Sequence, residues 1–218
     1  MNIASYIDHT VLKPETTLAD IKKLCAEAVA EKFAAVCVPP YFVSAAKGLV
    51  KDSDVKVATV IGFPFGYSLT EAKLAEIEQA INDGADELDV VHNITALKDG
   101  NFDYLQSEVK ACTELVHKAG KSIKIIVESG ILSDEELLKC CEIYAPLGID
   151  YMKTSTGYAQ TGASVHAVQL MRQNLPAGIH IKASGGIRTF AFAKELVDAG
   201  ADRIGCSASM GIVKESSE

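Results

Sequence analysis

The sequence has little of what marks secreted, membrane-spanning or nucleic-acid-binding proteins. No apolar run approaches the roughly 18 residues that a membrane span needs. The N-terminus, Met-Asn-Ile-Ala-Ser-Tyr-Ile-Asp, has neither the basic region nor the apolar region of a secretory signal. The six cysteines show no CxxC and no paired spacing, which is typical of reduced thiols in a cytosolic protein. The net charge of −8, without a basic stripe, argues against a nucleic-acid partner. We therefore expect a cytoplasmic protein with no membrane or nucleic-acid partner.

No Pro/Ser-rich linker or low-complexity segment divides the chain. A length of 218 residues with 48% apolar composition suits one domain over residues 1–218. We expect strands over residues 5–10, 34–39, 56–63, 87–93, 122–129, 151–156, 180–184 and 203–207. We expect helices near 17–32, 41–50, 69–83, 101–119, 133–145, 163–174 and 189–199, with a short one after 208. Eight strands, each followed by a helix, predict a single-domain (β/α)8 TIM barrel of the α/β class.

Local signals support these boundaries. Thr17, Ser133 and Thr189 stand where helix N-caps are expected, and Glu136 follows Ser133 by three residues as in a capping box. The segments 83–88, 147–152 and 199–204 each carry a glycine that closes a helix and an aspartate that precedes a strand. They mark the amino ends of the strands, the end of a barrel associated with stability. We disfavour an open doubly wound sheet because no GxGxxG follows the first strand.

Two lysines in similar settings are the most informative residues. Lys153 and Lys182 each lie in a short strand-like run, just before a turn rich in Ser, Thr and Gly. Because strand residues alternate between faces, each lysine lies opposite apolar neighbours, such as Met152 beside Lys153 and Ile181 beside Lys182. A lysine inside a buried strand is costly unless it has a partner or a task. Two of them on nearby strands indicate amine chemistry.

Further polar residues fall at the carboxyl ends of the expected strands, where barrels carry their active sites. The fourth strand has Asp89 and the fifth has Glu128. Glycine-rich turns follow the last two strands, at 184–188 and 205–209. In barrels such turns, with a helix N-terminus, often bind a phosphate through backbone N–H groups. The alternative is that they are plain connections between elements.

Six segments carry a resemblance to a known family. They are Ile7-Asp8-His9-Thr10-Val11-Leu12-Lys13-Pro14, Val60-Ile61-Gly62-Phe63-Pro64, Glu87-Leu88-Asp89-Val90-Val91, Ile126-Val127-Glu128-Ser129-Gly130, Lys153-Thr154-Ser155-Thr156-Gly157 and Lys182-Ala183-Ser184-Gly185-Gly186-Ile187-Arg188. Over nearly its whole length the chain resembles the deoxyribose-phosphate aldolases, class I Schiff-base aldolases with a (β/α)8 fold. The two lysine motifs together are the most specific part of this match.

The resemblance implies a lyase that reversibly cleaves 2-deoxy-D-ribose 5-phosphate to acetaldehyde and D-glyceraldehyde 3-phosphate. It implies that no metal or other cofactor is needed, and the five histidines form no HxxxH or HxH pair. It makes Lys153 the imine-forming residue, with Lys182 and Asp89 in proton transfer. It is compatible with a homo-oligomer, either a dimer or a tetramer.

Elementary electrostatics agrees with the need for a second lysine. An imine forms on a neutral amine, yet only about 1 in 2,500 free lysines is neutral at pH 7. A second ammonium group about 6 Å away would lower the pKa by roughly two units, and desolvation would lower it further. The repulsion is mutual, so charge alone does not say which lysine is the nucleophile. The alternative is a structural pair of lysines neutralised by Asp89 and Glu128.

Nine residues are candidates for binding a small phosphorylated aldehyde or sugar. They are Thr10, Cys37, Thr154, Thr156, Gly157, Gly185, Gly186, Gly205 and Ser207. Cys37 is expected as a wall residue of the pocket that the resemblance implies. Two positions depart from the family, since Tyr158 stands where some members have a lysine and Ala208 where some have a serine. These departures concern the affinity for phosphate.

Two other functions stay open. The first is another phosphosugar barrel lyase or isomerase, for instance an isomerase that uses Glu128 as a base and a lysine as an electrophile. The second is a non-catalytic phosphosugar-binding protein, which would keep the glycine turns and have no need for Lys153. Borohydride trapping and acetaldehyde release distinguish these from an aldolase.

Overall fold

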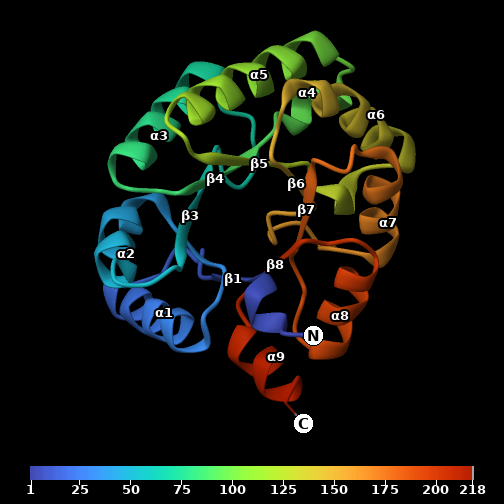
Figure 1. Ribbon diagram of the computed structural model, residues 1–218. Helices are drawn as coiled ribbons and strands as arrows, with labels where there is room; N and C mark the ends of the chain where they lie inside the picture. Colours follow the sequence, from blue (N-terminus) through green and yellow to red (C-terminus); the bar gives the residue numbers. More distant parts are fainter. Residues whose placement is uncertain (218) are drawn as a thin grey trace.

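Eight parallel strands close into a barrel in which each strand pairs with the next and β8 pairs with β1 (Figure 1). The computed structural model describes residues 1–217. The strands are β1 (Ile7–Thr10), β2 (Ala35–Val38), β3 (Lys56–Ile61), β4 (Glu87–Val91), β5 (Ser122–Ile126), β6 (Tyr151–Lys153), β7 (His180–Ser184) and β8 (Arg203–Cys206). The predicted TIM barrel is confirmed, and the alternative of an open sheet is wrong.

Helices surround the barrel and return the chain from the end of one strand to the start of the next. The α-helices of the described residues are α1 (Leu18–Glu31), α2 (Val43–Val50), α3 (Thr70–Asn82), α4 (Ile94–Lys98), α5 (Phe102–Lys118), α6 (Asp134–Tyr144), α7 (Val165–Asn174), α8 (Phe190–Asp198) and α9 (Ser209–Glu215). Helix α4 was not anticipated, because five residues are too few to show a helical period.

The predicted helix caps are confirmed. The Thr17 and Ser133 hydroxyls each accept from the backbone N–H three residues on, and both helices have complete capping boxes. The Thr189 hydroxyl accepts from the N–H of Phe192 at the start of α8. Each cap pairs an N–H that the first turn of a helix cannot satisfy, which stabilises the helix by about 1 kcal/mol.

The three repeated aspartates tie the amino ends of neighbouring strands together. The carboxylates of Asp86, Asp150 and Asp202 accept from backbone N–H groups of β3, β5 and β7 at 2.8–3.0 Å. The glycines two residues before each aspartate have the expected positive φ, between 74° and 115°. These contacts fix the strand register at the end of the barrel away from the chemistry.

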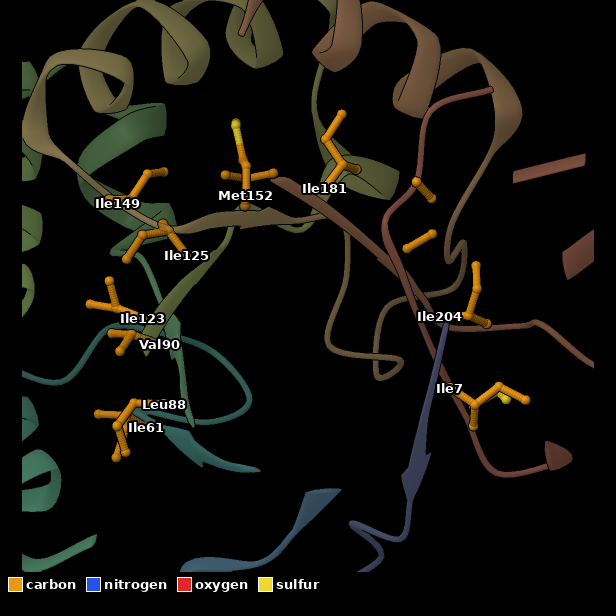
Figure 2. Close-up of a cluster of buried hydrophobic side chains, with 14 of the residues drawn as sticks. Ile7, Ile61, Leu88, Val90, Ile123, Ile125, Ile149, Met152, Ile181 and Ile204 are labelled. Carbon is orange, nitrogen blue, oxygen red and sulfur yellow. The ribbon is translucent and has the colours of Figure 1, made fainter. Parts of the chain in front are cut away.

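Strand residues alternate between the helices and the barrel interior. The outward positions form the main apolar core, part of which is drawn in Figure 2. Met152 and Ile181 lie in this core, as the alternation predicts. Each such buried side chain contributes about 1.5–3 kcal/mol. The inward positions of β2 and β3 form a second, small apolar cluster of Ala35, Cys37, Ala58 and Val60. The remaining six strands also point charged side chains inward, among them Lys153 and Lys182.

None of the helices within residues 1–217 combines the length and the apolar character that crossing a bilayer requires.

Candidate functional site

The strand register brings the charged side chains of the barrel interior together. Lys153 on β6 lies beside Lys182 on β7, and Asp89 on β4 lies beside Lys124 on β5. All four side chains point into the barrel interior. Strand residues alternate between the two faces, and each of the four is adjacent in sequence to an apolar residue of the outer core. Their exposed fractions are 3% for Lys153 and 0% for the other three.

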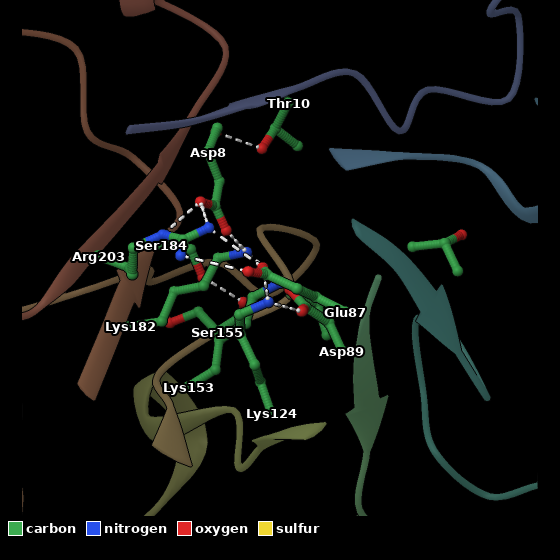
Figure 3. A network of polar contacts seen from close by, with 12 residues as sticks. Asp8, Thr10, Glu87, Asp89, Lys124, Lys153, Ser155, Lys182, Ser184 and Arg203 are labelled. Atoms are coloured by element: carbon green, nitrogen blue, oxygen red, sulfur yellow. Dashed lines mark hydrogen bonds and ion pairs between the residues drawn. The ribbon is translucent and has the colours of Figure 1, made fainter. Parts of the chain in front are cut away.

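Asp89 is the centre of this group (Figure 3). Its Oδ2 accepts from Lys153 at 2.8 Å and from Lys182 at 2.7 Å, and its Oδ1 accepts from Lys124 at 2.9 Å. Both predicted catalytic lysines therefore contact one carboxylate oxygen. The predicted trio of Lys153, Lys182 and Asp89 is in direct contact.

Three further residues close the contacts into a ring of ions. Lys182 contacts Asp8 at 2.5 Å, and Asp8 accepts from Arg203 Nε at 2.7 Å. Arg203 Nη2 lies 3.1 Å from Glu87, which accepts from Lys124 at 2.5 Å. Lys124 also donates to Asp89, and this contact closes the ring. We call this set the ion ring: Asp8, Glu87, Asp89, Lys124, Lys182 and Arg203.

The ion ring alternates three carboxylates with three cations, so it has no net charge when all six are ionised. Lys153 is bound to it through Asp89 alone. If Lys153 is protonated, the buried interior carries one uncompensated positive charge. If it is neutral, the interior is neutral, which is the state that a low dielectric favours.

The pKa values show the same difference between Lys153 and the lysines of the ion ring. Burial lowers the pKa of Lys153, and Lys182 lowers it further, against the opposing effect of Asp89. Burial alone would also lower the pKa of Lys182, but Asp8 and Asp89 outweigh it and hold that pKa above its ordinary value. The three lysines hold the pKa of Asp89 well below its ordinary value despite its burial. Of the two candidate lysines, Lys153 is thus the one with the lowered pKa.

A cavity of about 570 Å³ opens above Lys153 at the carboxyl ends of the strands. Lys153 lines this cavity, whereas the six residues of the ion ring do not. Seven of the nine predicted substrate-binding residues line it: Thr10, Thr156, Gly157, Gly185, Gly186, Gly205 and Ser207. The other two do not, since Cys37 is fully buried and the Thr154 hydroxyl donates to the Ser184 carbonyl.

Comparison with known proteins agrees with this geometry. The model of the DeoC/LacD family aldolases matches residues 2–213. The chain belongs to this family. It is 49% identical over 98% of its length to a deoxyribose-phosphate aldolase from Thermococcus gammatolerans, covering 96% of that protein. It is 48% identical over 98% of its length to one from Caldicellulosiruptor saccharolyticus, covering 97% of that protein.

A solved structure shows the same fold. The tetrameric deoxyribose phosphate aldolase from Aeropyrum pernix superimposes with a TM-score of 0.92 at 33% identity. The match covers 99% of this chain and 91% of that one. This DeoC/LacD aldolase is therefore a lyase with a TIM-barrel fold, as the sequence resemblance implied.

The glycine turns of this aldolase bring backbone close together on one side of the cavity. Gly157 and Gly185 have φ values of 88° and 86°, which side chains rarely adopt. A Cβ atom on Gly185 would lie 3.4 Å from the Gly157 Cα atom. The two turns therefore form one backbone-lined wall, beside Ser207 and Arg188 in the same cavity.

Tyr158 occupies the position where some family members have a lysine. Its hydroxyl donates to the Leu12 carbonyl at 2.9 Å, and its ring packs edge-on against Phe63. This side chain thus joins the loops after β1, β3 and β6 at the mouth of the cavity. It supplies no cation there.

Glu128 does not neutralise either lysine. It has a positive φ of 55°, and its carboxylate accepts from the Thr156 hydroxyl and the Thr156 N–H. Burial raises its pKa. Within residues 1–217 no ion pair of Glu128 is found, so the alternative of a structural lysine pair neutralised by Asp89 and Glu128 is wrong for Glu128.

Four residues of the ion ring were not predicted: Asp8, Glu87, Lys124 and Arg203. The alternation of strand residues contains the signal, because Asp8 precedes Thr10 by two residues and Glu87 precedes Asp89 by two. Lys124 interrupts the apolar run 123–127. The same alternation turns His92, three residues after Asp89, to the outer face of the barrel. It is buried there, with its Nδ1 2.7 Å from the Tyr144 hydroxyl. Burial lowers its pKa to about 3, so it packs as a neutral ring.

Residues 1–217 contain no group of three His, Cys, Asp or Glu side chains arranged to hold a metal ion.

Proposed function

We propose that the protein reversibly cleaves 2-deoxy-D-ribose 5-phosphate to acetaldehyde and D-glyceraldehyde 3-phosphate through an imine on Lys153. One observation carries this proposal. Lys153 is the lysine that the neutral ion ring leaves without a carboxylate of its own, and it is the member of the buried group that reaches the cavity.

The chemistry needs a neutral amine in contact with a proton carrier. Neutral Lys153 Nζ attacks the C1 aldehyde carbon of the open-chain sugar, and the carbinolamine loses water to give the imine. Loss of the 3-hydroxyl proton then breaks the C2–C3 bond, which releases D-glyceraldehyde 3-phosphate and leaves an enamine. Protonation at C2 and hydrolysis release acetaldehyde and restore the amine.

Asp89 and Lys182 are suited to move the protons of these steps. Asp89 Oδ2 accepts from both Nζ atoms, so one carboxylate oxygen connects the reacting amine to a second ammonium group. Asp89 stays ionised, because its pKa is well below the ordinary value. We assign Asp89 as the relay and Lys182 as the charge that opposes protonation of Lys153 and shares in the relay.

The backbone-lined wall is where we place the phosphate. Gly157, Gly185, Gly186 and Gly205 allow N–H groups to approach a ligand closely, and Ser207 adds a hydroxyl. Arg188 lines the same cavity and supplies a positive charge. Thr10 and Thr156 line the same cavity as Lys153 and are candidates for binding the sugar hydroxyls.

Residues 1–218 act in this proposal as one catalytic domain, because the ion ring draws on β1, β4, β5, β7 and β8. We infer a cytoplasmic enzyme whose partner is a small sugar phosphate. A homo-oligomer is supported by the tetramer described for the relative from Aeropyrum pernix.

Acetaldehyde release from 2-deoxy-D-ribose 5-phosphate, measured with a coupled alcohol dehydrogenase, tests the function. We expect turnover by the native chain and by Lys13→Arg, a conservative change of an exposed lysine at the cavity rim. We expect none from Lys153→Arg. A folded native chain that releases no acetaldehyde would refute the proposal.

A further inference from the structure

Two members of the ion ring lie at the end of the barrel opposite the chemistry. Glu87 and Arg203 are the first residues of β4 and β8, at the amino ends of the strands. Neither lines the cavity, and neither contacts Lys153. Both are nevertheless needed to close the ring, since Arg203 connects Asp8 to Glu87 and Glu87 connects Arg203 to Lys124.

The charge balance of the interior depends on these two residues as much as on the residues beside Lys153. Removing one carboxylate leaves the ring with a net positive charge, and removing one cation leaves it with a net negative charge. Lys153 is the group that can respond most readily by gaining or losing a proton, because it has the single carboxylate contact. Lys124 and Lys182 each have two.

We propose that Glu87 and Arg203 are positioning residues that set the charge state of Lys153 by holding the ion ring at zero net charge. The proposal rests on the function proposed above, in which Lys153 forms the imine. It assigns to both residues an effect on the charge state of a lysine that they do not touch.

Other charged or titratable groups face Lys153 and the two distant residues. Those around Lys153 are Asp89 on β4, Lys182 on β7, Cys37 on β2 and Glu128 after β5. Those around Glu87 and Arg203 are Asp8 on β1, Lys124 on β5 and Tyr151 on β6. None of these changes in the variants below, so Glu87→Gln and Arg203→Met each alter one charge of the ring.

The two substitutions have opposite expected effects. Glu87→Gln leaves an excess positive charge and should move the pH midpoint of imine formation down. Arg203→Met leaves an excess negative charge and should move it up. For a charge about 10 Å from Lys153 at an effective dielectric constant of about 20, each shift is about one pH unit. The double variant is neutral again and should return to the native midpoint.

Cyanoborohydride trapping with acetaldehyde measures this midpoint directly. The trapping rate at Lys153 is followed against pH for the native chain, both single variants and the double variant, each with its unfolding transition. Arg203→Lys keeps the charge and should keep the native midpoint. Glu78→Gln, an exposed carboxylate on α3, changes the net charge equally and should also keep it.

Opposite shifts with a native midpoint in the double variant support the proposal. Equal midpoints in Glu87→Gln and native protein, or shifts of both single variants in one direction, overturn it. If Arg203→Met does not fold, Glu87→Gln and the double variant still test the proposal. A lowered pH midpoint is expected for Glu87→Gln and a native midpoint for the double variant. If the native chain itself gives no adduct at Lys153, the proposed function fails instead.

Discussion

Two clusters of buried charge lie on opposite faces of the end of β4. Inside the barrel, Lys153 and the ion ring combine four basic side chains with three carboxylates. Outside it, Lys73 on α3 contacts Glu108 on α5 at 2.9 Å and donates to the Val91 carbonyl at 2.9 Å. Glu108 also accepts from the Asn93 N–H at 3.1 Å.

The two clusters are equally buried, with Lys73 0% exposed and Lys153 3%, so burial alone does not distinguish them. The two clusters differ in charge balance and in access to a cavity. Lys73 contacts one carboxylate and one carbonyl, and it does not line the cavity above Lys153. Lys153 shares its carboxylate with two other lysines and lines the cavity. A buried lysine is a candidate for chemistry when the surrounding carboxylates do not balance its charge and when a substrate can reach it.

The largest effect is expected from Lys153→Met. The change removes the amine and the excess positive charge, so turnover should fall to the detection limit while the ion ring stays neutral. The unfolding free energy should stay within about 1 kcal/mol of native, because no buried charge loses its partner. Lys153→Arg should be equally inactive, since a guanidinium stays protonated. Coupled acetaldehyde assays with denaturant unfolding check both; turnover in folded Lys153→Arg would contradict the account.

Asp89→Asn should reduce turnover by about 10²- to 10⁴-fold, the range for acid–base groups. The amide keeps the shape but loses the charge that three lysines share. We also expect a loss of about 3–5 kcal/mol in unfolding free energy, because buried ammonium groups lose their partner. Turnover and denaturant unfolding are measured on the same preparation. Near-native turnover would move the proton relay elsewhere, with Glu128 the next candidate.

Lys182→Leu should slow imine formation by about 10- to 100-fold and leave sugar-phosphate binding within about tenfold. Without this cation, Asp8 and Asp89 have an excess of negative charge that favours protonated Lys153. Burial is the larger cause of the lowered Lys153 pKa and remains in the variant, so the loss should be smaller than for Lys153→Met. The pH dependence of trapping checks this, and an unchanged midpoint would refute the role of Lys182.

Lys73→Met is the matched change in the other cluster and should have the smallest effect on turnover, within about threefold. It should instead cost about 3–5 kcal/mol of stability, because Glu108 is left buried without its cation. The double variant Lys73→Met/Glu108→Leu should recover much of this loss. Denaturant unfolding and turnover are the two measurements. A large loss of turnover at native stability would show that the Lys73 cluster is not purely structural.

Much of this arrangement could be predicted from local sequence. The alternation of apolar and polar residues placed Lys153 and Lys182 on the inward faces of adjacent strands, and the caps at Thr17 and Ser133 gave the helix starts. The glycine and aspartate pairs gave the strand starts. These features depend on residues a few positions apart, whose geometry the local backbone determines.

The ion ring could not be assembled in the same way. Its contact between Glu87 and Arg203 joins residues 116 positions apart, and it forms because the closed barrel brings β4 and β8 to face each other across the interior. The choice between Lys153 and Lys182 depends on Asp8, which lies on β1 and meets Lys182 only when β1 pairs with β8. Charge balance is a property of the folded interior and has no counterpart in a single strand.

We expect the imine to form on Lys153 and on none of the buried lysines Lys73, Lys124 and Lys182. Borohydride reduction in the presence of acetaldehyde, followed by peptide mapping, identifies the modified lysine. A reduced ethyl adduct should be found on Lys153 and on none of the other three, with loss of activity in proportion to the modified fraction. An adduct on Lys182, or full inactivation with Lys153 unmodified, would refute the assignment of Lys153.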